Sequence, residues 1–403
     1  MQYSGKPNRR PTWIQVIAIC LAVAAVTMLA TSYVLSARFA KKEAEVSGGF
    51  EKLEEIRALV DAYYVGEYEE QDLLDMLSVG YMSGINDQWS YYTTADSLNA
   101  LYESQSGTYA GIGVSVLLDS ETGLLTVVDV YEGSPAAEAG IRRFDKLYSV
   151  EGESVAVLGQ DATVAKVRGE PGTKVNLELL REGIVIPVTV ERRTVEVSSV
   201  YAELIGGEIG YLRLSELTKA AAAQFAEKLA VLQNIGAKCY IIDVRNNPGG
   251  QLSTLIKNLD QLMPEGEVFV ERDKAGNENR LTVDGEYYDL PVVVLVNEHT
   301  YSAAEYFAAV MQEQDRAYII GTPTTGKGEG QQTFRLSDGS AISFSVIKYY
   351  TPNGVSLGDK GGIVPDMHVE MTPEQIVAIG TVEYNEDPQI MAAVGYMQEI
   401  LYH

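Results

Sequence analysis

The spacing of apolar residues predicts helices near the start of the chain. Apolar positions recur at three- and four-residue steps through residues 50–63, which is the spacing of one helix face. A second helix is predicted at residues 71–83, where Gly84 ends the pattern. Residues 43–96 are therefore expected to form a helical segment.

An apolar run near the N-terminus is long enough to cross a membrane. The run from Trp13 to Leu35 contains no charged residue and exceeds the roughly 20 residues that a membrane-spanning helix needs. It predicts a cytoplasmic tail at residues 1–12 and a transmembrane anchor at residues 13–36. A cleaved signal peptide is the alternative, because Ala37 and Ala40 provide small residues at a suitable spacing. The length of the apolar run favours the anchor.

The middle of the chain has the alternating pattern of short strands. The predicted strands and helices lie between turn signals rich in glycine: strands at 124–130, 146–150, 174–181 and 184–191, with helices at 133–140 and 161–167. A further strand begins after Gly111-Ile112-Gly113. Residues 97–194 are therefore expected to form a small β-rich domain.

Beyond residue 195 the pattern changes to strands that alternate with longer helices. The predicted strands lie at 209–214, 239–244, 292–296 and 317–320, and the predicted helices at 219–234, 252–263 and 304–314. This alternation predicts an α/β core with a largely parallel sheet at residues 195–372. A C-terminal helical extension is expected at residues 373–403.

Composition and charge exclude several function classes. The chain has 403 residues, 46% of them hydrophobic, as expected of a globular protein with more than one domain. Its formal net charge of −25 argues against a nucleic-acid partner, because phosphates would be repelled. Only two cysteines, Cys20 and Cys239, and three histidines occur. Neither a disulfide framework nor a metal site is expected, and no cofactor is implied.

Candidate chemistry lies in the loops that follow the predicted parallel strands, at 243–250, 297–302 and 321–328. Function gathers at the carboxyl ends of such strands. Paired glycines at Gly249-Gly250 let backbone amides approach a ligand and can form one arm of an oxyanion hole. The amide of Ala303, at the start of a helix, can form the other arm.

Ser302 and Lys327 can form a nucleophile and base pair without a histidine. Each also has a simpler interpretation. Ser302 and Glu305 have the spacing of a capping box, and Lys327 could be a solvated loop lysine. One helix and one strand separate the two residues, which brings their loops to the same sheet edge. A lysine base must be buried, because an unperturbed lysine has a pKa of about 10.4 and is protonated at neutral pH.

The β-rich segment resembles a PDZ domain of the bacterial, protease-associated kind. The resemblance rests on ordered short matches: Gly111-Ile-Gly113, Gly133-Ser-Pro-Ala136, Ala139-Gly140-Ile141, Asp145-Lys-Leu147 and Arg168-Gly169 through Gly172-Thr173. It implies that Gly111, Ile112 and Gly113 bind the C-terminal tail of a partner. Arg168 is expected to contact that tail or the neighbouring domain. The alternative is that the glycines only shape a tight turn.

The chain from about residue 50 to 369 resembles the carboxy-terminal processing proteases, a Ser/Lys peptidase family with a PDZ domain. The matching stretches keep one order: Asp87-Gln-Trp-Ser90, Ile209-Gly-Tyr-Leu-Arg-Leu214, Asp243-Val-Arg-Asn-Asn-Pro-Gly-Gly250, Ser302-Ala-Ala-Glu305, Gly321-Thr-Pro-Thr-Thr-Gly-Lys-Gly328 with Gln331, Lys348-Tyr-Tyr-Thr-Pro-Asn-Gly354 and Gly362-Ile-Val-Pro-Asp366. The resemblance implies that Ser302 is the nucleophile, Lys327 the general base and Gln331 a residue that positions the lysine. Gly249-Gly250 match the family's oxyanion loop. Ala304 and Thr325 depart from the family's usual serine and aromatic residue.

The resemblance implies a serine endopeptidase that cuts protein substrates near apolar C-terminal tails, and it suggests a homodimer. With the apolar run as its anchor, the chain is expected to be a membrane-anchored, single-pass protein of the bacterial cell membrane with an extracytoplasmic catalytic domain. The alternatives are a non-enzymatic PDZ scaffold, a hydrolase that uses His299 as base, and a nucleotide-binding protein that uses residues 321–327 as a phosphate loop. Gly328 stands where a phosphate loop has Ser or Thr, and a hairpin rather than a helix is predicted afterwards.

Overall fold

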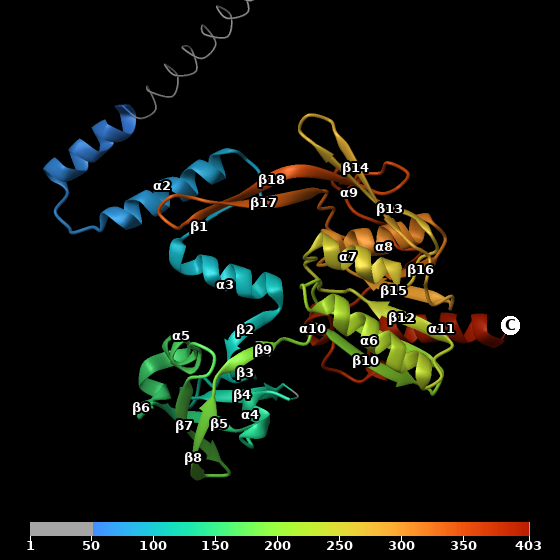
Figure 1. Cartoon of the computed structure of the whole chain (residues 1–403), viewed down its shortest axis with the longest axis horizontal. Coiled ribbons are helices and arrows are strands. Elements are labelled where there is room, and N and C mark those ends of the chain that lie inside the picture. Colours follow the sequence, from blue (N-terminus) through green and yellow to red (C-terminus); the bar gives the residue numbers. More distant parts are fainter. Residues whose placement is uncertain (1–50, 132, 403) are drawn as a thin grey trace, which may run out of the picture. The chain divides into compact units, whose positions relative to one another are not determined.

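The computed structural model describes residues 51–131 and 133–402, in two compact units that divide between Leu74 and Asp75 (Figure 1). In the first unit residues 51–63 form a helix, as the apolar spacing predicted. Helix α2 (Glu70–Gly84) crosses the division and confirms the second predicted helix. Apolar side chains of both helices are exposed, Ile56 and Met76 among them. The homodimer suggested for this segment stays a prediction.

The predicted transmembrane helix is not supported by the structure. The predicted tail at residues 1–12 and anchor at residues 13–36 lie outside the described residues. Within residues 51–131 and 133–402, no helix is both long and apolar enough to cross a bilayer. Helices α2 and α11 (Pro388–Tyr402), for example, have 15 residues each, whereas a membrane-spanning helix needs roughly 20. The single-pass fold and the membrane localisation are therefore not supported by the described residues.

The β-rich region is an antiparallel sheet of six strands with short helices (Figure 1). Its elements are β3 (Val114–Leu118), β4 (Leu125–Val130), β5 (Lys146–Val150), β6 (Glu153–Ser154), β7 (Lys174–Arg181), β8 (Ile184–Glu191), α4 (Pro135–Glu138) and α5 (Val155–Val167). A separate pair, β2 (Thr108–Gly111) and β9 (Arg193–Glu196), adjoins it, and α3 (Ala95–Ser106) precedes β2. Alternating residues of the strands, such as Val175, Leu177 and Leu179, face a buried core. The strands at 146–150, 174–181 and 184–191 are confirmed as predicted.

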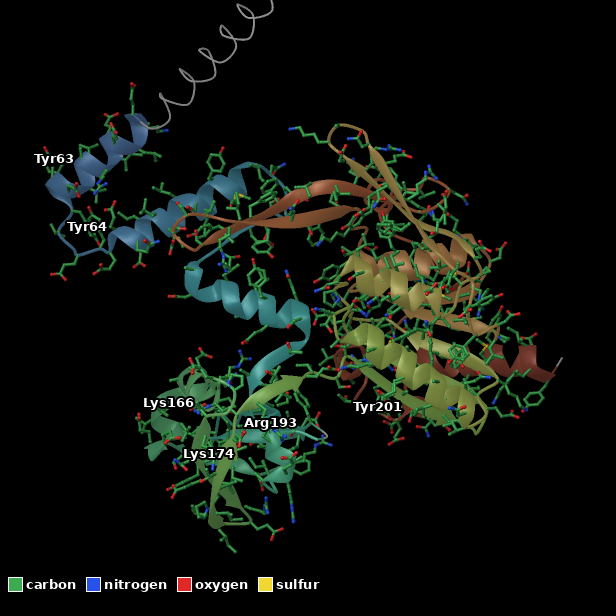
Figure 2. The ribbon with its side chains drawn as sticks, in the orientation of Figure 1. Tyr63, Tyr64, Lys166, Lys174, Arg193 and Tyr201 are labelled. Carbon is green, nitrogen blue, oxygen red and sulfur yellow. The ribbon has the colours of Figure 1, made fainter. Side chains whose placement is uncertain are left out.

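Ion pairs use many of the basic residues on this β-rich region. Lys166 contacts Glu153 at 2.9 Å, and Arg193 contacts Glu138 at 2.7 Å. Figure 2 labels Lys166, near the end of α5, and Arg193, at the start of β9. Each such pair neutralises one basic and one acidic side chain.

A mixed sheet of six strands lies at the centre of the larger region (Figure 1). In spatial order its strands are β10 (Val200–Ile205), β11 (Ile209–Leu214), β12 (Cys239–Asp243), β15 (Val292–Val296), β16 (Ala317–Gly321) and β19 (Met367–His368). The β10–β11 pair is antiparallel, and the remaining pairs are parallel. This arrangement places the loops after β12, β15 and β16 at one sheet edge.

Helices cover both faces of the mixed sheet. On one face α6 (Ala221–Asn234), α7 (Leu252–Asp260) and α8 (Ala303–Glu313) share a core with Val292, Val294 and Val296. On the other face α11 shares a core with Val293 and Leu295. Successive residues of β15 thus alternate between two cores, which explains why this strand is apolar throughout.

The prediction of a largely parallel sheet for the core is wrong, because the region also contains a second, antiparallel sheet. That sheet is built from β1 (Tyr91–Thr93), β13 (Gly266–Asp273), β14 (Glu278–Val283), β17 (Glu329–Arg335) and β18 (Ala341–Tyr350). Short connections join β13 to β14 and β17 to β18, and such hairpins force antiparallel pairing. Strand β1 pairs with β18 from a distant part of the chain. The hairpin of β17 and β18 is the one predicted after Gly328, whereas the strand-helix alternation did not reveal the other strands of this sheet.

A buried arginine ties the C-terminal segment to the loop after β12. This segment contains α9 (Leu357–Lys360), α10 (Pro373–Ala378), a 3-10 turn (Tyr384–Glu386) and α11. The side chain of Arg245 is fully buried and contacts Asp243 at 2.6 Å and Asp387 at 2.9 Å. A further bond joins Arg245 to Gln389 at 3.0 Å. Because a buried charge requires such partners, the start of α11 is fixed beside the loop.

Candidate active site

The loops after β12, β15 and β16 meet through hydrogen bonds at the sheet edge. The N–H of Asn246 donates to the side chain of Asn297 at 2.9 Å, which joins the first loop to the second. The N–H of Thr325 donates to the carbonyl of Thr300 at 3.3 Å, which joins the third loop to the second. The convergence expected from the parallel strands is therefore present.

Ser302 is the N-cap of α8 and has a strained backbone. Its φ of 58° and ψ of −131° lie in a region that non-glycine residues rarely adopt. Such a conformation costs about 1–3 kcal/mol and persists only where surrounding contacts impose it. A serine on a sharp, strained turn between a strand and a helix is the arrangement that exposes the nucleophile of several hydrolases. With 9% of its surface exposed, Ser302 lies just below the surface.

Glu305 is the buried group that joins the loops of Ser302 and Lys327. Its Oε2 accepts the N–H of Ser302 and the N–H of Lys327, each at 2.9 Å. Its Oε1 accepts the N–H of Gly326 at 2.6 Å and the hydroxyl of Thr324 at 2.5 Å. A single carboxylate oxygen thus holds the backbones of the predicted nucleophile and base. The capping-box pattern pointed to the first of these bonds alone.

The environment of Glu305 perturbs its acidity. Burial raises the pKa of Glu305 above its ordinary value, and hydrogen bonds from Thr324 and the backbone oppose the shift. The side chain is fully buried and accepts hydrogen bonds from three backbone N–H groups and one hydroxyl, so both of its oxygens act as acceptors. The protein therefore relies on a carboxylate here rather than on an amide.

We expect Glu305→Gln to impair both stability and activity. A glutamine presents an amide nitrogen to two of the donors that the carboxylate now accepts, and a lost hydrogen bond to a charged group is worth about 1.5–3 kcal/mol. The free energy of unfolding should fall by about 2–4 kcal/mol, and kcat/KM by roughly a hundredfold, because the two loops lose their shared partner. Denaturant titration and turnover measurements test this.

Glu313→Gln is the matched control on α8, since Glu313 accepts hydrogen bonds from Thr351 and Asn353 away from the site. Equal effects of both substitutions would contradict the assignment.

The ammonium of Lys327 lies on aromatic rings. Its Nζ is 4.5 Å from the ring centroid of Trp89 and 6.0 Å from that of Tyr301. Burial lowers the pKa of Lys327 from its ordinary value, while the carboxylates of Asp87, Glu329 and Glu305 act in the opposite direction. Lys327 is thus partly buried, and its pKa is shifted in the direction that a lysine base requires.

The side chain of Gln331 forms its hydrogen bonds within strands β17 and β18. Its Nε2 donates to the hydroxyl of Ser345 at 3.1 Å and to the carbonyl of Glu329 at 3.0 Å. Ser345 in turn bonds to Ser90, so Gln331 is linked through Ser345 to the turn at residues 87–90. A direct role of Gln331 in positioning the lysine stays a prediction.

The glycine loop lies against the start of α8, as predicted. A Cβ atom at Gly249 would be 2.9 Å from the nitrogen of Ala303 and from the Cβ of Ser302. Only a glycine allows this approach. The N–H of Gly249, however, donates to the side chain of Asn247 at 2.8 Å. The amides of Gly250 and Ala303 are therefore the better candidates for an oxyanion hole.

The predicted tail-binding residues surround a groove in the β-rich region. A pocket of about 330 Å³ between β3 and α5 is lined by Gly111, Ile112 and Arg168, with apolar side chains that include Val164. Gly113 lies beside it with a φ of 84°, and its carbonyl accepts the hydroxyl of Ser134 at 3.2 Å.

Arg168 is held by contacts at the edge of this groove. Its Nη1 lies 3.0 Å from a carboxylate oxygen of Glu103, and its guanidinium lies 5.1 Å from the ring centroid of Tyr109. Glu103 belongs to α3, so Arg168 bridges the groove and that helix.

The structure gives the rival chemistries little support. His299 is exposed, and its backbone N–H donates to the side chain of Asn297 at 3.2 Å. The loop at residues 321–327 is followed by strand β17, whereas a phosphate loop leads into a helix. Over the described part of the chain, no group of His, Cys, Asp and Glu side chains is placed to hold a metal ion.

Comparisons with known proteins agree with this organisation. Residues 208–369 match peptidase family S41, and residues 126–181 match the PDZ domain. The chain is 35% identical to a carboxyl-terminal-processing protease of Synechocystis, over 73% of this chain and 70% of that protein. It is 32% identical to the carboxy-terminal processing protease CtpA of Bacillus subtilis, over 80% of this chain and 69% of that protein. A solved S41 protease of Bacteroides fragilis shares the fold, with a TM-score of 0.50 at 18% identity over 80% of this chain and 90% of that chain.

Proposed function

This chain belongs to the carboxy-terminal processing proteases of peptidase family S41, and from that premise we propose that it is a serine endopeptidase whose nucleophile is Ser302 and whose general base is Lys327. The observation that carries the proposal is the carboxylate of Glu305, which accepts the backbone amides of both residues at one oxygen. The strained backbone of Ser302 and the burial of Lys327 support the same pair.

In the proposed reaction, Oγ of Ser302 attacks the scissile carbonyl carbon while its proton passes to the neutral amine of Lys327. The amides of Gly250 and Ala303 would stabilise the negative charge on the carbonyl oxygen, helped by the dipole of α8. The resulting ammonium then gives its proton to the departing amine. Water, deprotonated by the lysine, hydrolyses the acyl-enzyme.

The PDZ domain is proposed to select substrates by their C-terminal tails. Its groove is lined by apolar side chains and ends near backbone amides beside Gly111 and Gly113, which suits an apolar tail with a free carboxylate. The proposed substrates are therefore proteins with apolar C-termini, cut near that end. No observation favours a non-enzymatic PDZ scaffold over the proposed serine endopeptidase.

Cleavage of an unfolded protein with an apolar tail tests the proposal. We expect products that lack the C-terminal segment, and we expect amidation of the tail to lower kcat/KM about tenfold or more, because a charge-assisted hydrogen bond is lost. Mass spectrometry of the products and initial rates give both results. Equal rates for the free and amidated tails would exclude carboxylate recognition.

A matched pair of variants on α5 distinguishes the effect of the groove on cleavage from that of the rest of the PDZ domain. Val164 lines the groove, whereas Val157 on the same helix is 86% exposed and does not. Val164→Asp should weaken cleavage of the tailed substrate, and Val157→Asp should not.

A further inference from the structure

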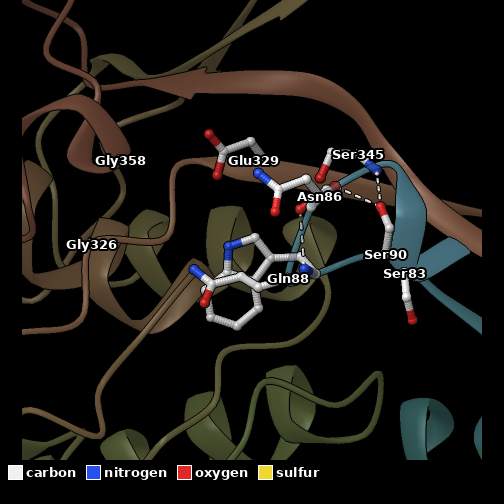
Figure 3. A pocket seen from close by; sticks show the side chains of 10 residues that line it. Ser83, Asn86, Gln88, Ser90, Gly326, Glu329, Ser345 and Gly358 are labelled. Carbon is white, nitrogen blue, oxygen red and sulfur yellow. Dashed lines mark hydrogen bonds between the residues drawn. The ribbon is translucent and has the colours of Figure 1, made fainter.

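The turn at residues 87–90 is fixed next to Lys327 by its own hydrogen bonds and by strand β18. Asp87 accepts the hydroxyl of Ser90 at 2.5 Å and the N–H of Trp89 at 3.0 Å. The N–H of Ser345, on β18, donates to the hydroxyl of Ser90 at 3.4 Å. Gln88 and Ser90 of this turn line a pocket of about 760 Å³ together with Glu329 and Ser345, and Figure 3 shows Ser90 bonded to Ser345 at its side. The turn is thus held in place where it meets the proposed base.

Trp89 and Tyr301 form an aromatic pair beneath the ammonium of Lys327. Their rings are stacked, with centroids 5.8 Å apart and planes inclined by 25°. The Nζ of Lys327 lies 4.5 Å from the Trp89 centroid, within the range of a cation–π contact, and 6.0 Å from that of Tyr301. Indole is the strongest of the aromatic side chains in such contacts.

A cation–π contact acts on one protonation state of the lysine. The ring face attracts the ammonium, whereas it has little attraction for the neutral amine. A general base must be neutral before it can accept the proton of the nucleophile. The contact with Trp89 therefore opposes the first step of the proposed reaction and favours the protonated, inactive lysine.

We propose that Trp89 is a positioning residue that holds the ammonium form of Lys327 on its ring face and so sets the pH above which the enzyme becomes active. The inference rests on the proposed function of Lys327 as base. It adds a residue far away in the sequence, to which neither the serine nor the lysine motif points.

The other groups that face Lys327 also shift the balance between its ammonium and neutral forms. Asp87 in the turn, Glu329 on β17 and Glu305 on α8 are acidic and also favour the ammonium, while burial disfavours it. Tyr301 is a further titratable neighbour, and burial raises its pKa, so its hydroxyl stays neutral. The contribution of Trp89 must therefore be varied without changing these charges or the burial of the lysine.

Fluorinated tryptophans meet this condition, because fluorine withdraws charge from the ring face with little change in its volume. The chain has two tryptophans, Trp13 and Trp89. In a Trp13→Phe background, Trp89 alone can be replaced by mono-, di- and trifluorotryptophan in the full chain. Each added fluorine should weaken the contact further, in line with its electrostatic origin.

The titration of Lys327 is followed through the indole emission of residue 89, because a cation on the ring alters the emission and a neutral amine does not. We expect an emission transition with pH that is absent in Lys327→Met, and that moves to lower pH with each fluorine. The total shift should be about half a unit to one unit. A transition that is absent, independent of Lys327 or unmoved by fluorination would overturn the inference.

The pH profile of kcat/KM, measured on the same proteins, separates this inference from the proposed function. The acid limb should move to lower pH together with the emission transition, while kcat on the alkaline plateau stays constant. A purely structural role of Trp89 would instead change the plateau and leave the midpoint in place. If the emission transition moves and the acid limb does not, the contact stands and Lys327 is not the base.

Discussion

Ser302→Ala is expected to lower kcat by about four orders of magnitude or more, which is the usual effect of removing a catalytic nucleophile. The rate that survives would come from substrate binding and the oxyanion amides alone. The fold should persist, because the bond from the Ser302 N–H to Glu305 does not involve the hydroxyl. Hydrolysis of a tailed substrate and thermal unfolding measure the two effects.

A matched control for this variant lies in the PDZ domain. Ser154 is also the N-cap of a helix, α5, and its side chain makes no capping hydrogen bond. Ser154→Ala removes a comparable hydroxyl far from the proposed chemistry and should leave kcat unchanged. Wild-type turnover by Ser302→Ala would show that the nucleophile is a different group.

Substitution of Lys327 is expected to have the second large effect, a loss of about a thousandfold to ten-thousandfold in kcat. Lys327→Ala removes the base, and Lys327→Arg keeps the charge but supplies a guanidinium that does not lose its proton in proteins. Both variants should therefore be inactive. Lys348, which is exposed and lies 3.7 Å from Asp359, provides the control Lys348→Ala.

The pH dependence of the wild-type enzyme follows from the same assignment. Burial lowers the pKa of Lys327 from its ordinary value of 10.5. The lysine is an inactive ammonium below its pKa and a neutral base above it, so kcat/KM should fall as the pH falls through that pKa. The midpoint should lie below 10.5. Activity in Lys327→Arg with an unchanged pH profile would contradict the role of the lysine.

Local pattern was enough to predict many of the elements that carry the site. Strands β11 and β15 have the predicted bounds, because each is a run of residues whose side chains alternate between two apolar cores. The start of α8 followed from the capping pattern of Ser302 and Glu305. Since parallel strands end at one edge, their order also predicted that the loops of Ser302, Lys327 and the glycine pair would meet.

Contacts between distant segments could not be predicted in this way. The antiparallel sheet depends on β1 reaching β18, and the bond between Ser90 and Ser345 joins residues 255 positions apart. Periodicity predicts only which face of an element is buried, and it does not predict which segment covers that face. The bond from the carboxamide of Gln331 to Ser345 likewise joins two strands, and no local pattern indicates it.

The stretch from Ser302 to Lys327 separates the features that the sequence predicts from those that only the tertiary structure decides. The sequence by itself determined the residue types, their order and the sheet edge at which they lie, because these follow from local spacing and strand direction. Only the tertiary structure decided that Glu305 binds both backbones and that Trp89 receives the ammonium. The bond from Lys327 to Glu305 and the contact of Lys327 with Trp89 depend on packing between segments that share no local signal, and packing is a property of the whole folded chain.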